Sequence, residues 1–462
     1  MMFHRFAGLR HAHFVGIGGA GMSGIAEVLA QYDLHVSGCD QAASEATARL
    51  EQLGVRVALG HSPEHLDGVD LLVVSSAIAA DNPEVRAARA RGITVVRRAE
   101  MLAELMRLKY GVAVAGTHGK TTTTSLVGAI LVEAGLDPTV IVGGRLRVSG
   151  TGARLGRSDY LVVEADEFDR SFLSLAPILA VVTSIDRDHL DTYGDLEEIR
   201  DAFAAFAGRV PFFGQVIACA DDPNVRDLLP RLADRRIVTY GLDGPWELVA
   251  SGLETDPSGS RFAVSHRQLG DLGRIAIPLP GLHNVRNALA AVAVGLALGV
   301  PIETIARALG DFKGVHRRFE RLGTFHGAEV VDDYAHHPTE VAATLAAARQ
   351  VFPRRTLHAV FQPHLYSRTR DLAVEFGRVL LAADRVIVTD VYASREKPIA
   401  GVSGELIVQA ARASGHARVD WCPLWRDARA LLAGVGEGDV VLTLGAGDVY
   451  RLAQELVAEA AA

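Results

Sequence analysis

Two patterns of hydrophobic and polar residues alternate along the first hundred positions. Short runs of β-branched and apolar residues are separated by longer segments in which apolar residues recur at helical spacing. The predicted strands lie at residues 13–15, 34–40, 55–60, 71–78 and 93–99, and the predicted helices at 22–32, 44–54 and 82–92. Continuous apolar strands between helices are typical of a parallel sheet. The pattern therefore predicts a small Rossmann-like unit.

The alternation continues in two further blocks. In the second block the predicted strands begin near residues 111, 159 and 178, and a long apolar helix covers 281–299. In the third block a strand, a polar loop and a helix follow one another from residues 328, 357, 385 and 438. We predict a three-domain α/β protein, with a P-loop ATPase-like, mainly parallel central sheet between two Rossmann-like domains. The predicted domains span residues 1–107, 108–315 and 316–462.

Composition narrows the possible functions. A chain of 462 residues is long enough for two or three domains. Its formal net charge of −8 argues against general binding to nucleic acid or membrane surfaces. Cys39, Cys219 and Cys422 are too far apart to indicate a disulfide framework or a metal motif. The N-terminus lacks the apolar core of a signal peptide, and the apolar run at 288–300 is too short to span a bilayer, so we expect a cytoplasmic protein.

A glycine loop, "GTHGKT", follows the strand predicted at 111–115 and precedes a helix. Backbone N–H groups at a helix start favour bound phosphate, and Lys120 adds a positive charge for terminal phosphates. Thr121 holds the hydroxyl position that coordinates Mg²⁺ in P-loops. The standard P-loop pattern requires glycine where this chain has Val114, so the loop is a shorter form.

Acidic residues end the next predicted strand. Glu164 is well placed to supply an oxygen ligand for Mg²⁺, with Asp166 and Glu167 nearby. His189 follows the next strand and is expected at the same edge of the sheet, where it is a further candidate ligand. The sequence therefore predicts a site for ATP and Mg²⁺.

An earlier glycine loop, "GIGGAGMSG", follows the first strand. Gly16, Gly18 and Gly21 fit the G-x-G-x-x-G pattern, and Asp40 lies about twenty residues later, as in dinucleotide-binding enzymes. A nicotinamide-dependent dehydrogenase is one interpretation, but it leaves the second glycine loop and the third block unexplained. A nucleotide-dependent regulatory protein without catalytic activity is another.

Eight segments, including the loop above, occur in order: "GTHGKTTTT", "EADEFDRSFL", "DHLDTYGD", "GLHNVRNALAA", "GVHRRFE", "DDYAHHPTEV", "FQPHLYSRTRDL" and "YASREKPIAGVSG". Together with "HFVGIGGAGMSGIAEVL" they resemble the Mur ligases of bacterial cell-wall synthesis, nearly from end to end. The resemblance is strongest to the alanine-adding branch of that family.

The resemblance implies a role for each matching position. The first domain would bind a UDP-sugar through Gly18, Gly19, Gly21, His61, Ser75 and Ser76. The second would bind ATP, with the third contributing, through Gly116, Thr117, His118, Gly119, Lys120, Thr121, Thr122, Asn284, Asn287, Arg318 and Asp332. His283 and Asp333 belong to the same motifs, and Asn287 would contact adenine. The Mg²⁺ ligands would be Thr121, Glu164 and His189. The amino acid would be held by His364 and Arg368, and the catalytic residues would be Lys120, His189, Arg318 and Arg368.

The resemblance also implies the reaction. ATP would activate the lactyl carboxylate of UDP-N-acetylmuramate as an acyl phosphate, and the amine of L-alanine would then displace phosphate. A related murein tripeptide ligase, or a folylpolyglutamate-type synthase, is the alternative. The N-terminal Rossmann-like unit argues against the synthase, and "FQPHLYSRT" favours alanine over the tripeptide. The expected partners are the two small-molecule substrates, with no nucleic acid or membrane, and the chain is expected to be a monomer or weak homodimer.

Two positions depart from family patterns. Relatives often carry a second arginine where this chain has Leu365, and Arg370 or Arg395 could compensate for it. Other Mur ligases use a carbamylated lysine to bridge two metal ions, but this chain has no lysine between Lys120 and Lys313. That absence agrees with the alanine-adding branch. The general base stays open among His336, His337 and His364.

Overall fold

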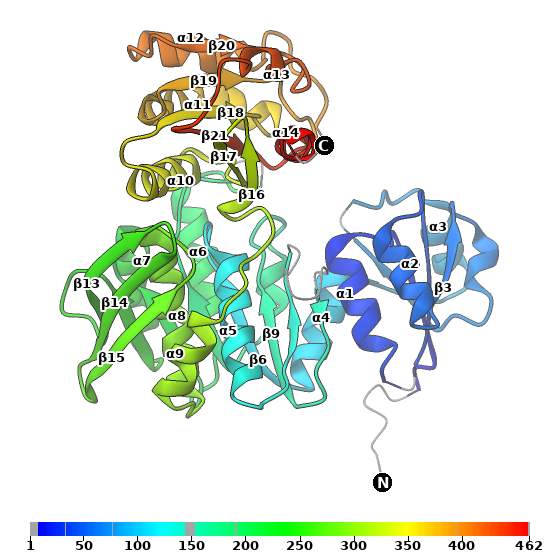
Figure 1. Ribbon diagram of the computed structural model, residues 1–462. Helices are drawn as coiled ribbons and strands as arrows, with labels where there is room; N and C mark the ends of the chain where they lie inside the picture. Colours follow the sequence, from blue (N-terminus) through cyan, green and yellow to red (C-terminus); the bar gives the residue numbers. More distant parts are fainter. Residues whose placement is uncertain are drawn as a thin grey trace. The chain divides into compact units, whose positions relative to one another are not determined.

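The computed structural model describes residues 8–32, 34–75, 77–143, 153–189, 192–394 and 396–460. Two compact units divide the described chain. The first lies within residues 1–252, 262–275 and 286–313, and the second within 253–261, 276–285 and 314–462. Across the described ranges the strands form three sheets, and the ribbon colours of Figure 1 follow their order along the sequence.

The first sheet has five strands in the order β3-β2-β1-β4-β5, and every neighbouring pair is parallel. Its elements are β1 (His11–Val15), α1 (Ala20–Leu29), β2 (His35–Asp40), α2 (Glu45–Gln52), β3 (Arg56–Leu59), η1 (Pro63–Leu66), β4 (Leu71–Val74), α3 (Pro83–Ala90), β5 (Thr94–Arg97) and α4 (Arg98–Arg107). The strand order reverses between β1 and β4. Ligands of open α/β sheets bind at such a switch point, beyond the carboxyl ends of the strands.

The second sheet has ten strands in the order β15-β14-β13-β12-β11-β10-β6-β9-β7-β8. The strands are β6 (Tyr110–Ala115), β7 (Thr139–Ile141), β8 (Ala153–Arg154), β9 (Tyr160–Glu164), β10 (Leu179–Val182), β11 (Gln215–Cys219), β12 (Ile237–Gly241), β13 (Leu248–Asp256), β14 (Gly259–His266) and β15 (Gly270–Ile277). The helices are α5 (Lys120–Glu133), η2 (Ser171–Ser174), α6 (Leu196–Ala207), α7 (Pro223–Leu228), η3 (Leu229–Leu232), α8 (Leu282–Ala297) and α9 (Ile302–Gly310). β9, β6 and β10 are parallel neighbours, so the loops that follow them meet at one edge.

The third sheet has the order β16-β17-β21-β18-β19-β20, and β16 is its antiparallel edge strand. Its elements are β16 (Glu320–Phe325), β17 (Ala328–Asp333), α10 (Pro338–Val351), β18 (Thr356–Phe361), α11 (Tyr366–Val379), η4 (Leu380–Ala382), β19 (Arg385–Val388), α12 (Glu405–Ala413), β20 (Val419–Trp421), α13 (Ala428–Leu431), β21 (Asp439–Leu444) and α14 (Tyr450–Ala460). Polar loops follow β17, β18, β19 and β21 at one edge.

Burial explains why the strands read as continuous apolar runs. Every residue of β10 is buried, as are the central residues of β9 and five of the six residues of β6. Strands covered on both faces have no position for exposed polar side chains. Among the described residues, no helix is long and apolar enough to cross a membrane.

Candidate active site

Two glycines of the loop between β6 and α5 occupy positions that a larger residue could not take. Gly116 has φ +137° and Gly119 has φ +82°, conformations that side chains rarely adopt. A Cβ atom on Gly116 would lie 2.0 Å from Thr183 Oγ1, and one on Gly119 would lie 2.4 Å from Asn287 Oδ1. These contacts leave no room for side chains, so the loop backbone is held close to its neighbours.

Hydrogen bonds fix this loop to the segment that follows β10. Thr117 N–H donates to the Ser184 carbonyl at 3.0 Å, and His118 N–H donates to Ser184 Oγ at 3.0 Å. The Thr183 hydroxyl donates to the His118 carbonyl at 2.6 Å. The Asp186 N–H donates to Thr117 Oγ1, and His118 Nε2 lies 3.0 Å from Asp186 Oδ2. The two loops therefore form one rigid edge at the start of α5.

Lys120 is the first residue of α5 and makes an ion pair with a buried carboxylate. Its ammonium donates to both carboxylate oxygens of Glu167, at 2.9 and 2.7 Å, and to the Gly116 carbonyl at 2.8 Å. Burial alone would lower the pKa of Lys120, but the Glu167 and Asp166 carboxylates raise it above its ordinary value. Lys120 therefore keeps its positive charge inside the loop.

Glu167 is 2% exposed, and burial raises its pKa to about 7 against the opposing effect of Lys120. The sequence placed Glu167 only near the metal site. Its direct pairing with Lys120 depends on the turn that follows β9, which the hydrophobic pattern does not encode.

Thr121 and Glu164 come together as the sequence predicted for oxygen ligands. The Thr121 hydroxyl donates to Glu164 Oε1 at 3.0 Å, and Gly143 N–H donates to Glu164 Oε2 at 2.7 Å. His189, with φ +54°, places Nε2 3.6 Å from Glu167 Oε1. A hydroxyl and carboxylates are hard oxygen donors that suit Mg²⁺. The residues present therefore fit that ion.

The remaining nucleotide candidates in this unit line the same helix start. Thr122 is buried in the first turn of α5. Asn287 accepts a hydrogen bond from the Thr123 hydroxyl at 3.2 Å, besides its close approach to Gly119. Asn287 thus supports the loop, and its contact with adenine stays a prediction.

Asp40, the acidic residue that fits the pattern of dinucleotide-binding enzymes, holds the first glycine loop in place. Gly18 N–H donates to Asp40 Oδ2 at 2.8 Å, and a Cβ on Gly18 would lie 3.0 Å from that oxygen. Asp40 therefore shapes the loop itself. Among the described residues no side chain makes a capping hydrogen bond at Gly19, the N-cap of α1, and a helix start of this kind favours a bound anion.

Arg98 is a charged residue near this loop that the sequence interpretation missed. A Cβ atom on Gly21 would lie 2.8 Å from Arg98 Nη1, so the glycine permits the arginine to approach. Its position in the sequence could have indicated this proximity, because Arg98 follows β5 at the same carboxyl edge of the sheet. It adds positive charge where a diphosphate is predicted.

The other predicted UDP-sugar residues have different surroundings. His61 Nδ1 lies 3.2 Å from Cys39 Sγ, and its side chain is 15% exposed. Ser75 follows β4 and is partly buried. Ser76 lies outside the described residues.

In the third sheet the predicted amino-acid residues are neighbours. His364 Nδ1 lies 3.2 Å from Arg368 Nη1, and Arg368 is 7% exposed. The ring of His364 contacts the rings of His336 and Tyr392, at centroid distances of 5.4 and 6.0 Å. Tyr392 was not singled out by the sequence, although it lies in one of the matching segments.

Leu365 is the N-cap residue of α11 and has φ +67°, an uncommon conformation for a bulky residue. Arg370, one of the two arginines considered as its replacement, instead binds the exposed Asp371, with Nε to Oδ1 at 2.7 Å. The other, Arg395, lies outside the described residues. His337 caps α10 by accepting from Thr339 N–H, which gives it a structural role.

The segment "GVHRRFE" folds against β17. Arg317 Nε donates to Asp332 Oδ2 at 3.0 Å, while the Arg318 guanidinium lies 5.0 Å from the centroid of the Tyr334 ring. Burial raises the pKa of Asp333 to about 6, although Arg318 opposes the shift. Arg317, which the sequence interpretation passed over, is therefore the arginine that binds Asp332.

Asn284 lies in a short segment of the second unit. It is buried, and its side-chain amide donates to the Pro280 carbonyl at 2.8 Å. That bond fixes the turn before α8.

Family models match three consecutive parts of the chain. The model described as "Mur ligase family, catalytic domain" matches residues 11–110, "Mur ligase middle domain" matches 114–295, and "Mur ligase, glutamate ligase domain" matches 317–447. The chain belongs to the Mur ligase family. The predicted α/β fold with three mainly parallel sheets and the family resemblance are thereby confirmed.

Individual Mur ligases are similar over nearly the whole chain. The UDP-N-acetylmuramate–L-alanine ligase of Solibacter usitatus is 52% identical over 450 residues, covering 97% of this chain and 95% of that protein. The crystal structure of UDP-N-acetylmuramate–alanine ligase from Thermotoga maritima has a TM-score of 0.81 at 29% identity, covering 98% of this chain and 99% of that one. A murein peptide ligase from Psychrobacter arcticus has a TM-score of 0.70 at 26% identity, covering 97% and 98%.

Proposed function

We propose that this Mur ligase joins L-alanine to the lactyl carboxylate of UDP-N-acetylmuramate at the expense of ATP, through an acyl phosphate. The observation that carries the proposal is the start of α5, where Lys120 and Thr121 face Glu167 and Glu164. The identity of about half to relatives named for this reaction supports the choice of substrates.

The residues at the start of α5 would bind and orient ATP. Lys120 and the backbone N–H groups of the loop would hold the terminal phosphates, because both present positive charge to an anion. Thr121, Glu164 and His189 would hold Mg²⁺. When bound, Mg²⁺ neutralises charge on the phosphates. The rigid contacts between the two loops keep these donors in place during phosphoryl transfer.

We assign the other roles by domain. Residues 1–107 bind the UDP-sugar through Gly18, Gly19, Gly21, His61, Ser75 and Ser76. Residues 108–315 bind ATP through the loop residues and through Asn284 and Asn287. Residues 316–462 bind the amino acid through His364 and Arg368, and Arg318 and Asp332 serve ATP. Arg368 suits the carboxylate of alanine because a guanidinium can bind two oxygens at once.

Release of ADP from the full chain, supplied with ATP, Mg²⁺ and UDP-N-acetylmuramate, tests the proposal. We expect release that depends on L-alanine and is weaker with glycine and L-serine, which differ by one small group. The murein tripeptide should not replace L-alanine, and preference for the tripeptide would favour the alternative ligase. ADP release that depends on neither L-alanine nor the tripeptide would refute the proposal. Arg89→Ala, which removes a charge from the exposed face of α3, is the control for charge substitutions.

A further inference from the structure

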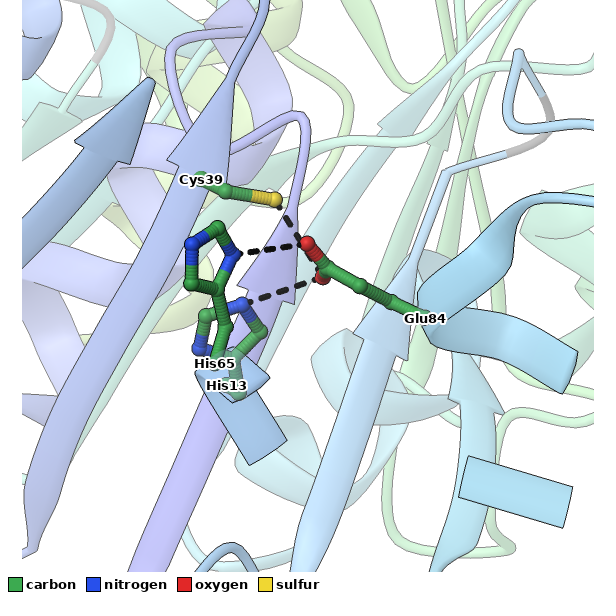
Figure 2. Close-up of side chains that lie close together, drawn as sticks. All are labelled: His13, Cys39, His65 and Glu84. Carbon is green, nitrogen blue, oxygen red and sulfur yellow. Dashed lines mark hydrogen bonds and ion pairs between the residues drawn. The ribbon is translucent and has the colours of Figure 1, made fainter. Parts of the chain in front are cut away.

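Four side chains of the first sheet converge beside the loop that follows β1, where Gly16 N–H donates to the Cys39 carbonyl at 2.8 Å. His13 lies on β1, Cys39 near the end of β2, His65 in η1 and Glu84 in the first turn of α3. Their nitrogen, sulfur and oxygen atoms all lie within 4.8 Å of one another. His13, Cys39 and Glu84 are at most 1% exposed. Figure 2 shows the other three side chains directed at the Glu84 carboxylate.

The carboxylate is the centre of the group. Glu84 Oε2 lies 3.2 Å from His13 Nε2 and 3.3 Å from Cys39 Sγ, while Oε1 lies 2.8 Å from His65 Nδ1. Four donor atoms of a tetrahedral zinc site are separated by about 3.3–3.7 Å, because each lies about 2.0–2.3 Å from the metal. The separations from the Glu84 oxygens, 2.8–3.3 Å, are at or below the lower end of this range, and all the donor atoms lie within 4.8 Å of one another, so the group would open slightly around an ion.

The hydrogen bonds of His11 and Ser37 direct a lone pair of His13 into the group. The Gly68 carbonyl can only accept, so neutral His11 donates to it from Nδ1, at 3.2 Å. His11 Nε2 then accepts from the Ser37 hydroxyl at 2.7 Å, and Ser37 Oγ in turn accepts from His13 Nδ1 at 2.8 Å. This chain leaves Nε2 of neutral His13 without a proton.

That nitrogen is buried and makes no hydrogen bond of standard geometry with any described residue. It nevertheless faces the Glu84 carboxylate at 3.2 Å. A lone pair that faces a carboxylate in a buried site is unfavourable unless positive charge lies between them. The charge must be a second proton on His13 or a cation bound by the group.

We propose that His13 Nε2, Cys39 Sγ, His65 Nδ1 and a Glu84 oxygen form a binding site for a borderline-soft divalent cation of the zinc type. A thiolate and two imidazoles select such a metal over Mg²⁺. The Ser37 hydroxyl would orient His13, as partners of the second ring nitrogen do in zinc sites. On binding, the Cys39 S–H bond breaks, a sulfur–metal bond forms and the proton passes to solvent.

The site differs from the Mg²⁺ site in its ligands and in its place in the fold. The residues predicted to hold Mg²⁺ are in the second sheet and include no cysteine. His61 also touches Cys39, and Ser62 N–H donates to Glu84 Oε1 at 2.9 Å. Metal bound by the group would therefore also fix the loop that carries His61.

The experiment uses the reduced full-length chain with Zn²⁺ or Co²⁺ as probe. We expect about one equivalent of Zn²⁺ to remain after dialysis, and Co²⁺ to give a thiolate-to-metal charge-transfer band together with release of a proton. Cys39→Ser and His65→Ala should lose the band. Ser37→Ala should keep it with roughly 10–100-fold weaker affinity, because it disturbs the orientation of His13 and removes no ligand.

Two controls separate this site from other metal binding. Cys422→Ser removes a buried thiol of the third sheet, and His189→Ala alters the predicted Mg²⁺ site; both should keep the band. Circular dichroism verifies that each variant is folded, and partly exposed His65 provides a ligand change if Cys39→Ser does not fold. Absence of the band in the unaltered chain, or its persistence in either ligand variant, overturns the proposal and leaves a protonated His13–Glu84 pair.

Discussion

Substitution of Lys120 by methionine tests the buried ion pair at the start of α5. The change keeps a long unbranched side chain but removes the ammonium that binds Glu167 at 2.7 and 2.9 Å. Glu167 is 2% exposed, so its carboxylate is left without a counter-charge. Removing one partner of a buried pair costs about 3–5 kcal/mol. In a domain of about 200 residues this corresponds to a melting temperature lower by roughly 6–20 °C.

The second substitution separates stability from activity. Glu167→Gln removes the carboxylate that requires the positive charge of Lys120. Combining it with Lys120→Met should therefore restore most of the stability lost in Lys120→Met alone. ADP release should stay absent in both variants, because the phosphates still lack the ammonium. Arg91→Ala, which breaks the exposed pair with Asp67, is the control and should change the melting temperature by less than about 3 °C.

The pH dependence follows from the pKa of Glu167, which burial raises to about 7 even beside Lys120. A carboxyl whose pKa is raised in the folded state is destabilising as pH rises through that range. The deficit of Lys120→Met should therefore shrink from pH 8 to pH 5. Differential scanning calorimetry at several pH values measures it. A double variant no more stable than Lys120→Met, or a deficit that grows at low pH, would refute the reasoning.

Three further outcomes are expected. Gly116→Ala should destabilise the chain by about 3 kcal/mol or more, because the new Cβ atom would combine an unfavourable φ with a 2.0 Å approach to Thr183. Gly135 also has a positive φ but has open space around it, so Gly135→Ala should cost only about 1–2 kcal/mol. Thermal melting compares the two variants. Thr121→Ala should raise the Mg²⁺ concentration required for ADP release, read from a titration, and an unchanged requirement would remove Thr121 from the metal site. Burial raises the pKa of Asp333 to about 6, so this residue should lower the stability of the folded chain as pH rises from 4 to 6. The melting temperature of Asp333→Asn should depend less on pH over this range.

The hydrophobic pattern predicted most of the fold, because buried parallel strands leave a strong signal. The predicted helix at 281–299 corresponds to α8 (Leu282–Ala297), and each β-strand and helix predicted in the first block is present. In the second sheet only β6, β9 and β10 were predicted, and β13, β14 and β15 are among the strands that were not. β13 and β15 are largely exposed and rich in polar residues, so they lack the continuous apolar runs that marked β6, β9 and β10.

Sequence motifs predicted the parts of the site that are local in the chain, but not the contacts between residues that are far apart in it. "GTHGKT" placed Lys120 and Thr121, because a strand, a glycine loop and a helix start are all local in sequence. The pairing of Lys120 with Glu167 and the contact of Asn287 with Gly119 join residues 47 and 168 positions apart. Such contacts depend on how separate strands and helices pack, which no single-sequence pattern records.

Transfer of oxygen from substrate to phosphate tests the proposed reaction most directly. UDP-N-acetylmuramate labelled with ¹⁸O in its lactyl carboxylate is incubated with the full chain, ATP, Mg²⁺ and L-alanine, and the inorganic phosphate is examined by mass spectrometry. An acyl phosphate transfers one labelled oxygen to phosphate for each amide formed, and we expect that result. Amide formation with unlabelled phosphate would contradict it.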